Sequence, residues 1–82
     1  MSAADSSEAT IAGGFWNHIG TNSADSAIGG GYENNIAANS WFATIAGGRL
    51  NDIGTNSHYS AIGGGYDNTI AADSVSATIA GG

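Results

Sequence analysis

The chain is a tandem repeat of 17 residues, and this period constrains its fold more than any other feature. The segment Ala-Thr-Ile-Ala-Gly-Gly occurs at 9–14, 43–48 and 77–82, and Ser-Ala-Ile-Gly-Gly-Gly lies midway between these copies at 26–31 and 60–65. Every position of the repeat therefore forms a column of equivalent residues. A fixed period that fills a chain is typical of solenoids, in which each coil stacks on the next.

The repeat predicts one all-β solenoid domain over residues 1–82, with about five coils. Each half-repeat places one Ile between small residues and then reaches a Gly-Gly or Asn-Ser break, which is typical of short strands joined by turns. We expect two strands per coil, over 9–13 and 17–22 in the first, stacked in parallel about 4.8 Å apart. The Asn and Ser columns would form hydrogen-bonded ladders. The predicted core consists of Ile11, Ile19, Ile28, Ile36, Ile45, Ile53, Ile62, Ile70 and Ile79.

Large apolar residues are few for a chain of 82 residues, because Ala and Gly fill more than a third of it. Burying each of nine Ile contributes roughly 1.5–3 kcal/mol, against an ordering cost of about 1.5 kcal/mol per residue. Opposite Ile28, the strand face carries only Ala27 and Gly29, which suits close approach of another sheet. The sequence therefore predicts a homotrimer with a shared core. Its uncapped repeat ends predict end-to-end stacking of copies.

Charge and composition exclude several classes of partner. The formal net charge is −6 and the one basic residue is Arg49, so no electrostatic surface for nucleic acid or anionic membrane is expected. The chain has no Cys, which excludes disulfides and thiolate metal sites. Residues 1–8 lack the charged and apolar regions of a signal peptide, and no apolar stretch approaches the length of a membrane span.

No catalytic, cofactor or metal site is predicted. Ser and Asp follow the repeat, whereas a catalytic group should interrupt it, and His18 and His58 fall in different columns. The run 63–68 is similar to the calcium-binding nonapeptide of β-rolls. However, Trp16 and Leu50 interrupt its acidic column, so a calcium ladder is not expected. We predict that the protein is not an enzyme.

Four columns that vary along the chain fall at two corners of the coil. They contain all seven aromatic residues. Corner loops of a rigid scaffold commonly carry binding residues, and aromatic side chains are favoured anchors. Alternatively, these side chains stack along the axis and seal the seam between chains, with Tyr32, Arg49 and Tyr66 forming a cation–π column. The candidate binding residues are Trp41, Phe42, His58, Tyr59, Phe15 and Trp16.

Two segments carry a resemblance to a known family: Asn-Ser-Ala-Asp-Ser-Ala-Ile-Gly at 22–29 and Asn-Ser-His-Tyr-Ser-Ala-Ile-Gly at 56–63. They resemble the head repeats of trimeric autotransporter adhesins of the YadA type, and related repeats of phage tail fibres. Residues 39–46 match more loosely, and the resemblance covers essentially the whole chain. It implies a left-handed parallel β-roll, assembled as a homotrimer and displayed outside the cell for adhesion.

These observations favour a structural or adhesive fibre module, located extracellularly on a cell surface or virion, that presents its corner residues to a host glycan or protein receptor. Three alternatives remain. An ice-binding solenoid is favoured by Thr10, Thr44 and Thr78, although Thr alternates with Ala in that column. The others are a calcium-stabilised roll, and a designed or excised scaffold that binds no ligand.

Overall fold

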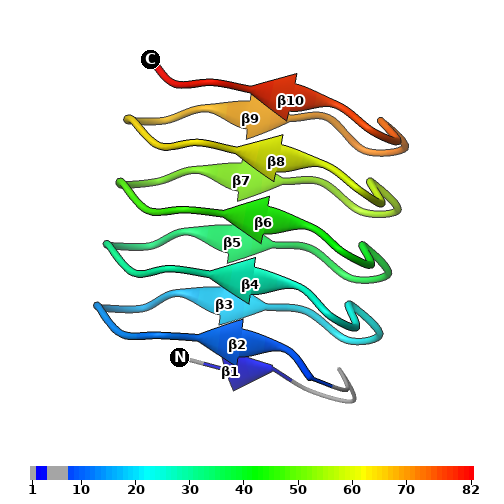
Figure 1. Cartoon of the computed structure of the whole chain (residues 1–82), viewed down its shortest axis with the longest axis horizontal. Coiled ribbons are helices and arrows are strands. Elements are labelled where there is room, and N and C mark those ends of the chain that lie inside the picture. Colours follow the sequence, from blue (N-terminus) through cyan, green and yellow to red (C-terminus); the bar gives the residue numbers. More distant parts are fainter. Residues whose placement is uncertain (1, 4–7) are drawn as a thin grey trace.

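The chain folds as a β-solenoid, seen in a computed structural model that describes residues 2–3 and 8–82 (Figure 1). Met1 and residues 4–7, which the predicted domain includes, lie outside the described residues. Each strand pairs in parallel with the strand 17 residues later, as in Thr10 with Ala27. This register confirms the predicted period and parallel stacking. About four turns form a flat body of 29 × 25 × 13 Å.

The described residues form two parallel sheets of five two-residue strands. One sheet contains β1 (Ser2–Ala3), β3 (His18–Ile19), β5 (Asn35–Ile36), β7 (Asp52–Ile53) and β9 (Thr69–Ile70), and the other contains β2 (Thr10–Ile11), β4 (Ala27–Ile28), β6 (Thr44–Ile45), β8 (Ala61–Ile62) and β10 (Thr78–Ile79). The predicted strand lengths were wrong: strands were expected over 9–13 and 17–22, and the observed β2 and β3 have two residues each. Left-handed residues such as Glu8, Gly14, Trp16 and Asn22, with φ between 56° and 86°, turn the backbone out of the extended conformation near both strands.

The isoleucine columns form a core between the two sheets of one chain. The second residue of β2 to β10 is Ile, and the alternation of side chains turns it inward. Ile70 is 4% exposed, Ile11 and Ile79 are partly buried, and six are fully buried: Ile19, Ile28, Ile36, Ile45, Ile53 and Ile62. One chain therefore encloses the columns by itself. Their burial does not require the additional chains that the sequence led us to expect.

Asparagine forms a ladder inside the Gly-Gly corner, as predicted. The backbone N–H of Asn34 donates to Oδ1 of Asn17 at 3.0 Å, and its Nδ2 donates to the carbonyl oxygens of Gly30 and Gly48, each at 3.0 Å. Gly31, with φ 94°, completes this corner, where a Cβ atom would collide with the carbonyl oxygen of Gly48. The Asn column thus supplies hydrogen-bond partners to a corner where glycine positions such as Gly31 and Gly48 have no room for a side chain.

Serine forms the equivalent ladders at the opposite corner. Ser26 Oγ donates to the carbonyl oxygen of Ser40 at 2.7 Å and accepts from the backbone N–H of Ala43 at 3.0 Å. Within the described part of the chain, every buried side-chain nitrogen or oxygen has a hydrogen-bond partner. The interior is therefore polar at both corners and apolar between the sheets.

The outer face of the β2–β10 sheet is flat and carries small residues. Thr10, Thr44 and Thr78 are exposed, with Ala27 and Ala61 half-buried between them. On the other sheet, Asn35 Nδ2 donates to Asp52 Oδ1 at 2.6 Å. No helix in the described ranges could span a membrane.

Candidate functional site

The variable columns lie on opposite edges of the solenoid, where the chain passes from one sheet to the other (Figure 1). We call one the Trp41 edge and the other the Arg49 edge. The six candidate binding residues are therefore divided between two separate surfaces. The Trp41 edge is defined by Trp41, Phe42, His58 and Tyr59, and the Arg49 edge by Phe15, Trp16, Tyr32, Arg49 and Tyr66.

The Trp41 edge contains two ring stacks that run along the solenoid axis. The ring centroids of Trp41 and His58 are 4.1 Å apart with an interplanar angle of 29°. The ring centroids of Phe42 and Tyr59 are 5.3 Å apart, and the two ring planes are almost parallel, with an interplanar angle of 1°. The predicted stacking of these four side chains is confirmed. Trp41, Phe42 and Tyr59 remain 46%, 48% and 58% exposed, so the rings are ordered by one another and still face solvent.

A backbone hydrogen bond orients His58. The backbone N–H of Trp41 donates to Nδ1 of His58 at 3.0 Å. Because an N–H group only donates, Nδ1 is the acceptor and the neutral imidazole carries its proton on Nε2. The His58 ring is therefore fixed by stacking on one side and by a hydrogen bond at its edge. Residue spacing alone does not predict this bond.

Bulky residues occupy left-handed backbone positions at this edge. Phe42 has φ 57° and Tyr59 has φ 59°, although left-handed backbone costs a residue with a side chain about 1–2 kcal/mol. The sequence prediction placed the turns at Gly-Gly and Asn-Ser breaks and missed this column. A signal was available, because Asp25 shares the column and Asp tolerates left-handed backbone better than most residues.

The aromatic stack is two coils tall. One coil earlier, the column pair is Ala24 and Asp25, with the backbone N–H of Phe42 donating to the carbonyl of Ala24 at 3.0 Å. One coil later, the pair is Val75 and Ser76. No ring of the neighbouring coils therefore stacks on the faces of Trp41 and Phe42 that point toward the Ala24–Asp25 rung.

Acidic residues lie along the same edge. Glu8 and Asp25 occupy successive positions of one column, and the hydrogen bond and negative charge of Asp25 raise the pKa of the fully exposed Glu8 carboxyl. Asp73 is exposed at the same corner of a later coil. The single Arg lies on the opposite edge and the chain has no Lys, so neither a guanidinium nor an ammonium side chain balances these carboxylates.

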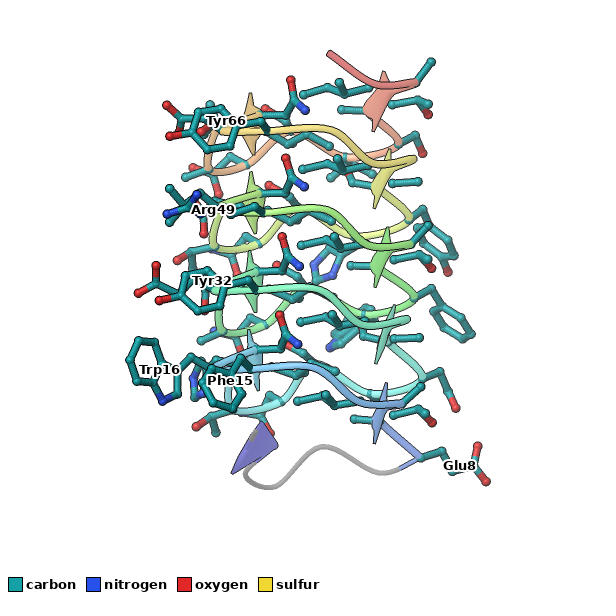
Figure 2. All side chains as sticks on the ribbon, turned by 90° about the vertical axis from the view of Figure 1, so that its left-hand side faces the viewer. Glu8, Phe15, Trp16, Tyr32, Arg49 and Tyr66 are labelled. Atoms are coloured by element: carbon teal, nitrogen blue, oxygen red, sulfur yellow. The ribbon has the colours of Figure 1, made fainter. Side chains whose placement is uncertain are left out.

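The Arg49 edge carries a longer ladder, which faces the viewer in Figure 2. Phe15 and Trp16 stack at 5.5 Å, and Tyr32 lies 6.2 and 5.5 Å from them. Arg49 Cζ lies 5.2 Å from the ring centroid of Tyr32 and 5.6 Å from that of Tyr66. The predicted cation–π column is confirmed, with the guanidinium carbon between two tyrosine rings.

The geometry suits binding on an open surface. The described residues enclose no pocket, and none of their His, Asp and Glu side chains form a group of three that could hold a metal ion. His18 lies in strand β3 and His58 on the Trp41 edge. What the two edges offer a ligand is exposed rings together with a few charged groups.

Comparisons of the chain with family models, characterised proteins and solved structures return no match. No neighbour therefore links it to the adhesin heads that its repeats resemble.

Proposed function

We propose that this protein is a non-enzymatic module of an adhesive fibre, in which a rigid β-solenoid presents the Trp41 edge to a receptor outside the cell. The observation that carries the proposal is the combination of order and exposure at this edge. Its rings are held by stacking and by the His58 hydrogen bond, yet about half of each Trp41 and Phe42 side chain is exposed. Aromatic anchors that are already ordered lose little conformational entropy on binding.

The proposed module is a homotrimer of left-handed β-rolls on a cell surface or virion. The flat outer face of the β2–β10 sheet supports this assembly, because its small Thr, Ala and Gly residues would let the backbone of another copy approach closely. The isoleucine core does not, since it is complete within one chain. A solution mass of three times the 8.1 kDa of one chain would support the trimer, and a stable folded species of 8.1 kDa would contradict it.

Substitutions on the two edges test the binding function. Trp41→Ala and Tyr59→Ala should leave the melting temperature nearly unchanged while removing binding to receptor-bearing cells or an array of glycans and proteins. Trp16→Ala is the matched control, because Trp16 is equally aromatic and 62% exposed but lies on the other edge. Binding that survives both Trp41→Ala and Tyr59→Ala would overturn the proposal.

The exposed threonines support ice binding as a second candidate function. Thr10, Thr44 and Thr78 lie on the flat β2–β10 face at intervals of two coils, or about 9.6 Å. A measurement of thermal hysteresis at millimolar concentration tests it. No hysteresis would dismiss this candidate without affecting the adhesive one.

A further inference from the structure

The Arg49 edge shows how this solenoid accommodates a guanidinium group. Arg49 occupies one rung of a column whose neighbouring rungs are Tyr32 and Tyr66, and its Cζ atom lies 5.2 and 5.6 Å from their ring centroids (Figure 2). The guanidinium group therefore fits between rings of the coil before it and the coil after it. An aromatic ring that is stacked on one side only, with its other face open, therefore presents half of a guanidinium site.

The Trp41 edge has such an open face. Trp41 and Phe42 stack on the rung that follows them, and the rung that precedes them carries the small Ala24 and the acidic Asp25. Trp is the aromatic side chain that attracts cations most strongly. Aromatic faces thus lie next to a coil that carries a carboxylate. No Lys or Arg of the same chain supplies a cation there, because Arg49 is the only such residue and lies on the other edge.

We propose that the Trp41 edge binds arginine side chains of a basic protein segment, with a guanidinium group stacked against Trp41 and Phe42 and paired with Asp25. This inference rests on the proposed binding function of the edge and names the chemistry of its receptor. In the complex, the arginine of the partner takes the place beside Trp41 that Arg49 takes beside Tyr32 on the opposite edge.

Charge and shape both favour arginine over the other ligands of an aromatic surface. Glu8, Asp25 and Asp73 are exposed along this edge in a chain of net charge −6, which attracts cations and repels acidic glycans. The hydrogen bond and charge of Asp25 raise the pKa of Glu8, and a bound cation would relieve the repulsion between them. The surface is flat and has no pocket to enclose a compact ammonium group, whereas a planar guanidinium stacks on an open ring and pairs with a carboxylate through its edge.

The test uses peptides of equal charge and a protein with one tryptophan. Trp16→Phe leaves Trp41 as the only tryptophan, so its fluorescence reports on this edge alone. We expect hexa-arginine to change this fluorescence saturably and to bind about two- to fivefold more tightly than hexa-lysine at 0.15 M salt. Calorimetry should show that Trp41→Ala removes the preference for arginine. Asp25→Asn should weaken both peptides, and Tyr66→Phe, on the opposite edge, should change neither.

Equal binding of the two peptides, unaffected by Trp41→Ala, would reduce the effect to general charge attraction and overturn the inference. Binding of a neutral glycan to Trp41 without binding of hexa-arginine would also overturn it, and would leave the adhesive function in place. A third outcome is that Trp41→Ala abolishes cell binding while hexa-arginine fails to compete with the receptor. It would likewise overturn the inference and leave the adhesive function in place. A Trp41 side chain that is protected from solvent in the native assembly would contradict both proposals.

Discussion

Ile45→Ala should be one of the most destabilising single truncations in the chain. Ile45 is fully buried in the central coil, between Ile28 and Ile62 of its own column and facing the β5 strand across the core. Truncation removes three carbon atoms at about 0.8 kcal/mol each, and the cavity that remains adds about 1 kcal/mol. We expect a loss of about 3–4 kcal/mol, because rungs fixed by backbone hydrogen bonds on both sides cannot collapse into the space.

The matched variant is Ile79→Ala, which makes the same chemical change where the side chain is only partly buried. It should cost about 1–2 kcal/mol. Urea unfolding followed by circular dichroism at one protein concentration measures both values, with unchanged m-values showing that the folded and unfolded states remain comparable. Equal losses for the two variants, or a loss below about 1 kcal/mol for Ile45→Ala, would refute the single-chain core.

Three further predictions follow from the edges. Glu33→Asn should raise the melting temperature by a few degrees, because Glu33 is exposed at φ 53° and Asn tolerates left-handed backbone at lower cost; a lower value would contradict this. Glu8→Gln should stabilise the chain more at pH 7 than at pH 4. The raised pKa of Glu8 gives stability that is present below the ordinary value of 4.5 and lost as pH rises through the raised pKa, so a gain that does not depend on pH would refute the acid pair. Nitrogen NMR of His58 at neutral pH should show the proton on Nε2, and a proton on Nδ1 would rule out the bond from Trp41.

The repeat was sufficient to predict the stacking but not the length of the strands. Residues 17 apart must lie on one another in a parallel solenoid, so the Ile, Asn and Ser columns and the Trp41–His58 pair could all be inferred from spacing. The strands proved shorter because bulky residues such as Trp16 and Phe42 adopt left-handed backbone. The residue types Trp and Phe give no reason to expect that conformation, and the one available signal is that Asp67 and Asp25 share their columns.

The prediction of a shared core rested on an incomplete energy balance. It compared the burial of nine Ile with the entropy of ordering 82 residues and did not count the polar interior. In the structure, Asn34 and Ser26 each satisfy backbone groups of neighbouring coils, and these ladders stabilise corners that contain no large apolar side chain. The acidic pair was missed as well, although Glu8 and Asp25 are one period apart in the sequence.

Solvent access to Trp41 in the assembled protein tests the account most directly. With Trp16→Phe, fluorescence arises from Trp41 alone, and the 46% exposure of its side chain predicts red-shifted emission that acrylamide quenches efficiently at every protein concentration. Blue-shifted emission that resists quenching would show that the Trp41 edge seals an interface between copies. That result would contradict its role as a binding surface.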